Sequence, residues 1–163
     1  MLYHKYKPLA SRVYCAGLAL LLVLSEVFSS NVQDTLPGFS RIMRLGLTGC
    51  AVLLLAGKII LLTGYEARWQ KVLIAVVLVY TAFSSWYGGD LWFFLAALIG
   101  LGAKDVDWET ALRFYLVTAV AGLVLVQLLH FATPLMPYKF YCRNWDFGYG
   151  HYNGFGARLV GVF

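Results

Sequence analysis

The chain has 163 residues, of which 61% are hydrophobic and 13% charged, and its mean hydropathy is +0.72. An ordinary soluble domain is about 45–50% apolar and about 25% charged, so the composition excludes a soluble globular protein and indicates a membrane protein. The net charge is +5, but the lysines and arginines are spread over the junctions between apolar runs. This distribution suits the orientation of membrane helices better than nucleic-acid binding. The three cysteines form no CxxC pair, and Cys15 and Cys50 lie in apolar runs where a thiol behaves as a small buried hydrophobe.

Five apolar runs follow one another, and each is expected to form a helix because lipid offers the backbone no hydrogen-bond partner. They cover residues 13–30, 45–63, 72–87, 91–103 and 111–131. The basic flank and long apolar run at the N-terminus favour a retained signal anchor. The fourth run is short and by itself also fits a re-entrant or buried segment; Gly88, Gly89 and Asp90 join it to the third as a tight hairpin. We therefore predict an all-α polytopic protein with about five spans, forming a single transmembrane domain over residues 1–163.

The basic residues predict the orientation, because lysine and arginine are enriched in cytoplasmic loops. Alternation along the chain, with a cytoplasmic N-terminus, brings most of them to the cytoplasmic side. These residues are Lys5, Lys7, Arg12, Arg68, Lys71 and Lys104. The loop 31–44 opposes the pattern, since it is expected outside but carries Arg41 and Arg44. In this orientation the segment that follows the fifth span faces outward.

Polar side chains within the predicted spans are functional hypotheses by default. We expect Lys58 to extend to the interface and Glu26 to lie near the interface rather than to carry protons. Gln127 and His130 are expected either to face the external site or to hydrogen-bond a neighbouring helix. The carboxylates of residues 105–109 are expected to cap the following helix and complement its dipole rather than to bind a metal ion.

A long loop over residues 132–158 follows the fifth span, and its stretch RNWDFGYGHYNGFGARL (143–159) concentrates polar groups. Arg143 and Arg158 carry planar cationic groups suited to phosphate or pyrophosphate, and His151 can act as an acid or base near neutral pH. Glycines allow the backbone to approach a bulky ligand closely; they are Gly148, Gly150, Gly154 and Gly156. The same stretch also fits an interfacial loop whose aromatic residues form a belt and whose arginines bind lipid phosphates.

The segment GYGHYNGFG resembles the GFxHPNxxG signature of bacterial O-antigen and capsular polysaccharide polymerases and the related lipid-A ligases. The matching residues are Arg143, Gly148, Tyr149, His151, Asn153 and Gly156. Tyr152 stands where that family usually has proline. The family has ten or more spans and a second external loop with further arginines and a histidine. The final RLVGVF looks like the start of another span, so the chain is expected to be the N-terminal portion of such an enzyme, inactive by itself.

The resemblance implies a multi-pass protein of the bacterial plasma membrane that takes part in cell-surface polysaccharide biosynthesis. Such enzymes transfer undecaprenyl-pyrophosphate-linked glycans on the outer face without a cofactor or metal ion. It implies His151 as catalytic base or orienting group, Arg143 and Arg158 as pyrophosphate ligands, and Asn153 and Tyr149 as substrate contacts. The turn glycines are Gly148, Gly154 and Gly156. The alternative is a non-catalytic membrane protein, such as a transporter fragment or a helper subunit of a polysaccharide-export locus. The expected partners are membrane lipids and other polysaccharide-export proteins, and no nucleic acid is expected to bind.

Overall fold

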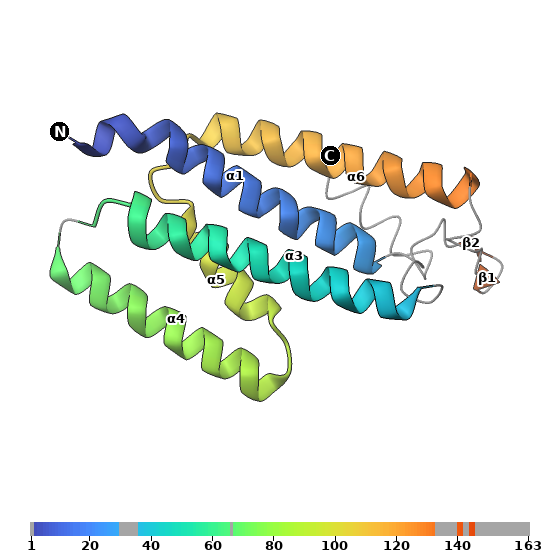
Figure 1. The fold of residues 1–163 in the computed structure, drawn as a ribbon, viewed down its shortest axis with the longest axis horizontal. Helices are drawn as coiled ribbons and strands as arrows, with labels where there is room; N and C mark the ends of the chain where they lie inside the picture. Colours follow the sequence, from blue (N-terminus) through green and yellow to red (C-terminus); the bar gives the residue numbers. More distant parts are fainter. Residues whose placement is uncertain (1, 30–35, 66, 133–139, 142–143, 146–163) are drawn as a thin grey trace. The chain divides into compact units, whose positions relative to one another are not determined.

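A computed structural model describes residues 2–29, 36–65, 67–132, 140–141 and 144–145 (Figure 1). Its elements are the helices α1 (Leu2–Ser29), α3 (Pro37–Gly57), α4 (Arg68–Gly88), α5 (Trp92–Gly102) and α6 (Trp108–Ala132), the π-helix η1 (Lys58–Leu62), and the strands β1 (Phe140–Tyr141) and β2 (Asn144–Trp145). Four segments are long and apolar enough to cross a membrane: Lys7–Glu26, Ser40–Leu62, Arg68–Gly88 and Trp108–Ala132. The α5 helix is apolar but has 11 residues. The all-α polytopic architecture is therefore confirmed, with four full-length candidate spans and one shorter apolar helix.

Residue contacts divide the chain into two units, one of residues 1–18 and 50–111 and one of residues 19–49 and 112–163. The first unit contains η1, α4, α5 and parts of α1 and α3, and the second contains the other parts of α1 and α3 together with most of α6. Buried apolar residues of the first unit include Ala10, Tyr14, Leu55, Ile59, Leu95 and Leu98. Those of the second unit include Leu21, Leu24, Ala119 and Val126. Each unit therefore has buried side chains of its own.

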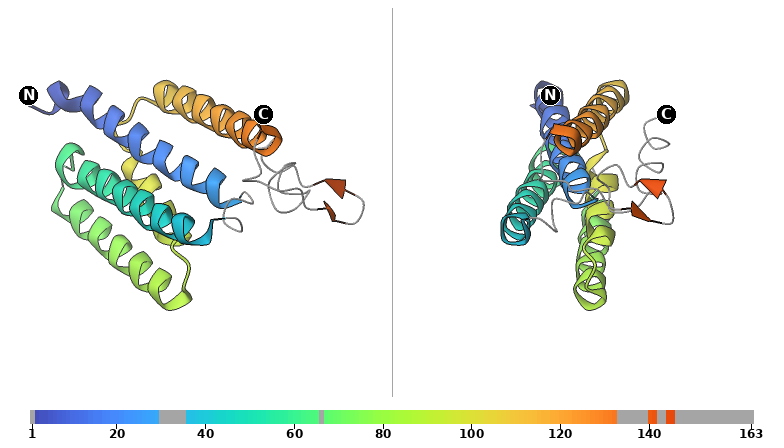
Figure 2. Two further views of the ribbon diagram at one scale, coloured as in Figure 1. Left: turned by 45° about the vertical axis from the view of Figure 1, so that its right-hand side comes forward. Right: turned by 90° about the vertical axis from the view of Figure 1, so that its right-hand side faces the viewer.

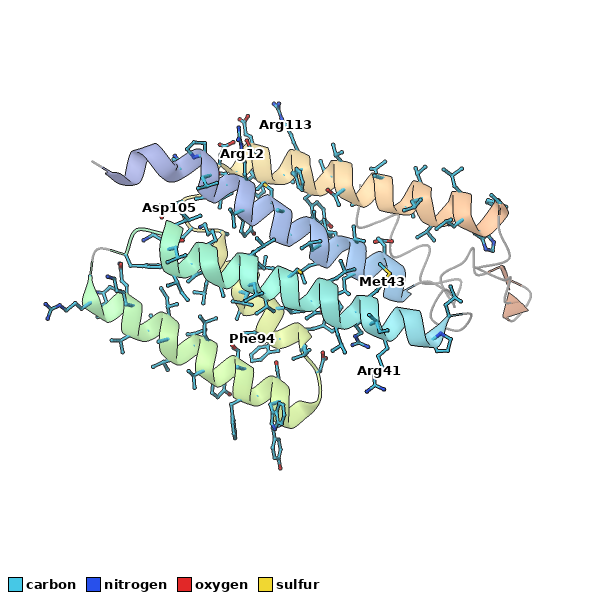
Figure 3. The ribbon with its side chains drawn as sticks, in the orientation of Figure 1. Arg12, Arg41, Met43, Phe94, Asp105 and Arg113 are labelled. Atoms are coloured by element: carbon cyan, nitrogen blue, oxygen red, sulfur yellow. The ribbon has the colours of Figure 1, made fainter. Side chains whose placement is uncertain are left out.

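The α3 helix begins earlier than its apolar run. Pro37 occupies the first helical position, where its missing N–H has no intrahelical partner to lose, and the Ser40 N–H donates to the Leu36 carbonyl at 2.9 Å. Arg41 and Arg44 consequently lie on a helix, so the expectation of a loop extending to residue 44 is wrong. Figure 3 shows the Arg41 side chain pointing away from its helix, and it is exposed. The first turns of α3 are polar but still helical, because Pro37 favours the start of a helix and the backbone hydrogen bonds continue from there.

The predicted hairpin between the third and fourth runs is confirmed (Figure 2). Gly89 ends α4 with φ of 70°, a left-handed conformation that glycine adopts without steric cost. Asp90 then accepts a hydrogen bond from the Trp92 N–H at 2.9 Å, and the Ser85 hydroxyl accepts one from the Phe94 N–H at 3.1 Å. These bonds satisfy two of the N-terminal amides of α5 and hold α4 against α5.

Most of α4 is not covered by the rest of the protein, since only 11% of its most apolar 18-residue segment is buried. The exposed surface is largely apolar. Its exposed large side chains are Trp69, Val72, Leu73, Val76, Val79, Tyr80, Phe83, Trp86 and Tyr87. Contact with membrane lipid accounts for such a surface, which water would not tolerate over this length. Of the two cysteines expected to be buried, Cys15 is buried but Cys50 is exposed, because its position on α3 turns away from the buried residues.

Candidate functional site

The site residues predicted from the C-terminal motif lie outside the described residues. They are His151, Arg143, Asn153, Arg158, Tyr149, Gly148, Gly154 and Gly156. Just before the motif, β1 pairs with β2 in antiparallel register, Phe140 opposite Trp145 and Tyr141 opposite Asn144. This pairing falls within the segment expected to be a loop, and no turn signal in the sequence predicted it.

Two polar residues of the predicted spans are buried in the second unit. Glu26 is 7% exposed, and a Cβ placed on Gly122 would lie 2.9 Å from the Glu26 Cγ. The glycine therefore makes room for the Glu26 side chain against α6. His130 is 3% exposed, and its ring meets the Phe131 ring edge to face with 5.1 Å between centroids.

Lys58 is fully buried in the first unit; that its ammonium group extends to the membrane interface stays a prediction. Its ammonium group donates a hydrogen bond to the Lys104 carbonyl. That carbonyl belongs to the turn after α5, where helix-terminal carbonyls have no intrahelical partner and Asp105 adopts φ of 63°. A backbone acceptor within the protein thus replaces water as the partner of the ammonium group.

The turn after α5 is held against the connection between η1 and α4. The Lys104 ammonium donates to the Gly64 carbonyl at 2.6 Å and lies 4.5 Å from the centroid of the Tyr65 ring. The Thr63 hydroxyl donates to the carbonyl of Lys58, the first residue of the π-helix, at 3.0 Å.

The first unit therefore gathers segments that the charge pattern predicted on one side of the membrane. The Asp107 N–H donates to the Ser11 hydroxyl of α1 at 3.4 Å, next to Arg12. Lys104 reaches the connection that precedes Arg68. The structure places the three basic segments at one end of this unit; that this end is cytoplasmic stays a prediction.

A cavity of about 530 Å³ lies between η1, the 63–65 connection and α4, and we call it the α4 cavity. It is lined by Ile59, Ile60, Thr63, Gly64, Tyr65, Lys71, Ile74, Ala75 and Leu78. Because α4 runs back alongside η1 (Figure 1), the polar lining residues lie at the loop end and the apolar ones along η1 and α4. Lys71 carries the only charge among the described lining residues. In the sequence, Lys71 indicates only the orientation of the helices, since nothing there places it in one cavity with Tyr65.

Tyr65 lines this cavity, and its hydroxyl is buried. That hydroxyl lies near the Thr63 hydroxyl but makes no hydrogen bond of normal geometry within the described chain. Burial raises the pKa of Tyr65; the nearby Thr63 lowers it in part, and the negative charge of Asp105 raises it further. Tyr65 is therefore held as a neutral phenol with an unused donor.

The carboxylate of Asp107 has the capping role expected for this segment. It accepts hydrogen bonds from the Thr110 N–H at 3.0 Å and from the Thr110 hydroxyl, which satisfies one of the free amides at the start of α6. Within the described part of the chain, no group of three His, Cys, Asp or Glu residues is arranged to hold a metal ion.

Comparison of the chain with protein-family models, with curated proteins and with solved structures found no match.

Proposed function

We propose that this membrane protein acts in cell-surface polysaccharide biosynthesis and binds undecaprenyl-pyrophosphate-linked glycans through the loop that contains residues 143–158. The observation that carries the proposal is the motif itself, in which Arg143 precedes Gly148, His151 and Asn153 at the spacing of the polymerase and ligase signature.

The chemistry of these residues suits the substrate. Arginine binds pyrophosphate oxygens with two parallel N–H donors and stays charged at any working pH. A histidine with a pKa near neutrality can accept the proton of an attacking sugar hydroxyl, so His151 would serve as the base. The acceptor oxygen would bond to the anomeric carbon of the donor sugar as that carbon's bond to the pyrophosphate oxygen breaks. The leaving group is undecaprenyl pyrophosphate, whose charge Arg143 and Arg158 would bind, so the transfer requires no cofactor.

The position of the motif in the chain also supports the proposal. The apolar helix α6, 25 residues long, ends at Ala132, and the motif begins at Arg143, between β1 and β2 in the sequence. A polar loop that directly follows a candidate span lies near the membrane surface, where a pyrophosphate on a polyprenyl anchor is located.

Binding of undecaprenyl pyrophosphate tests the proposal more directly than transfer does, because transfer in the family also involves a second external loop. The full chain is reconstituted in lipid nanodiscs, and the dissociation constants of undecaprenyl pyrophosphate and of undecaprenyl monophosphate are measured. Wild-type protein should prefer the pyrophosphate. Since a charge-assisted hydrogen bond contributes about 1.5–3 kcal/mol, R143Q and R158Q should each weaken its binding about tenfold or more.

Two further variants sharpen the result. R41Q removes one exposed positive charge from α3 and should leave binding unchanged, which controls for net charge. H151A should retain pyrophosphate binding, because the proposed role of His151 is toward the acceptor hydroxyl. Equal binding by wild type, R143Q and R158Q, or an equal loss in R41Q, would refute the proposal and favour an interfacial loop.

A further inference from the structure

The α4 cavity has the two-part character of a lipid site. Its apolar walls are Ile59 and Ile60 from η1 and Ile74 and Leu78 from α4, all hydrocarbon side chains. Its polar end holds Lys71 and the donor groups of the 63–65 connection. Lys71 and Leu78 are seven residues apart, which corresponds to about 10 Å along a helix axis. The volume of about 530 Å³ falls within the range of about 300–1,000 Å³ that is usual for small-molecule sites.

The polar end favours a negative charge. Lys71 lines it and carries its charge; the Lys104 ammonium adds positive charge nearby, since it lies over the ring of the lining residue Tyr65, although it does not itself line the cavity. The opposing carboxylate is Asp105, which interacts with Lys58 and Tyr65.

An occupant that uses both parts must combine an anion with a hydrocarbon chain. A free anion would leave the isoleucine and leucine walls uncovered, and a neutral hydrocarbon would leave Lys71 unused. The surface at the cavity is apolar, with Ile60 74% and the neighbouring Leu61 79% exposed, so the cavity opens where lipid chains are available. We propose that the α4 cavity binds one anionic phospholipid, with its phosphate beside Lys71 and an acyl chain between η1 and α4. This site is independent of the glycan function proposed above.

Native mass spectrometry of the delipidated full chain in a nonionic detergent tests the proposal. The chain is titrated with phosphatidylglycerol, with phosphatidylcholine of the same acyl chains, and with glycerol 3-phosphate. We expect the first phosphatidylglycerol to bind about fivefold or more tightly than phosphatidylcholine, since one lysine near an anionic lipid contributes about 1 kcal/mol. Equal binding of the two phospholipids, or equally tight binding of glycerol 3-phosphate, would overturn the proposal.

Variants locate the bound lipid. K71Q should weaken phosphatidylglycerol binding about fivefold and remove the preference over phosphatidylcholine, whereas R41Q should do neither. A75W places an indole in the cavity and should reduce binding of both phospholipids; A82W, two turns further along α4 and outside the lining, is its matched control. Wild-type binding by both K71Q and A75W would show that the lipid lies elsewhere. Because Lys71 is exposed, K71Q should fold normally. It therefore still tests the site if A75W does not fold.

Discussion

Replacing Gly17 of α1 with alanine should destabilise the first unit, because α1 and α3 approach each other closely at this position. An added Cβ would lie 2.9 Å from the Leu55 Cγ and 3.0 Å from its Cδ2. Real Cβ atoms do not approach other carbons this closely, and Leu55 is 0% exposed, so its side chain has no free space to enter. Overpacking of a core costs about 1–3 kcal/mol, and the better helix propensity of alanine returns about 0.5–1 kcal/mol. The expected net loss is about 1–2 kcal/mol.

The assay is SDS-induced unfolding of the purified chain in dodecylmaltoside, followed by tryptophan fluorescence. G49A on α3 is the matched control, since a Cβ at Gly49 meets no atom within 4 Å; it should be neutral or slightly stabilising. The double variant G17A/L55A adds a second check, because shortening Leu55 removes the atoms that clash. Its loss should be smaller than the sum of the two single losses by about 1–2 kcal/mol. Additive losses, or equal stability of G17A and G49A, would refute the close approach.

Three further predictions concern the polar groups of the first unit. K58M should lose about 1–3 kcal/mol in the same unfolding assay, because it leaves the buried Lys104 carbonyl without its donor, and K58A should lose more through the added cavity; full stability of K58A would contradict the observed burial. D107A should cost about 0.5–2 kcal/mol through loss of the α6 cap, and D107S should recover most of it, whereas equal loss in both would argue against capping. The raised pKa of Tyr65 means that the folded protein favours the neutral phenol. The contribution of Tyr65 to the free energy of unfolding is therefore complete below the unfolded pKa of about 10 and declines as the pH rises above that value. Unfolding measured at pH 9 and pH 11 should show a smaller alkaline loss for Y65F than for wild type, and equal losses would contradict the prediction.

Helix formation was predictable because it depends on properties of each segment alone. An apolar run in lipid must satisfy its backbone internally, so every predicted run corresponds to a helix. The α4–α5 hairpin was predictable for the same reason, since only glycine readily adopts the φ of 70° that Gly89 has. Asp107 was predictable as a cap because capping joins residues three apart. The helix start at Pro37 was missed because hydropathy does not report on the polar turns of a helix.

Apolar composition and the five apolar runs are enough to identify a helical membrane protein, and the motif around His151, on which the proposed function depends, is also visible in the amino-acid order. The burial of Lys58, whose ammonium group contacts a carbonyl 46 residues away, and the α4 cavity between η1, the connection after it and α4 become visible only when the chain is folded. Hydropathy, capping and turn propensity act over a few neighbouring residues, whereas a buried charge and a cavity depend on which distant backbone and side-chain groups are packed around them.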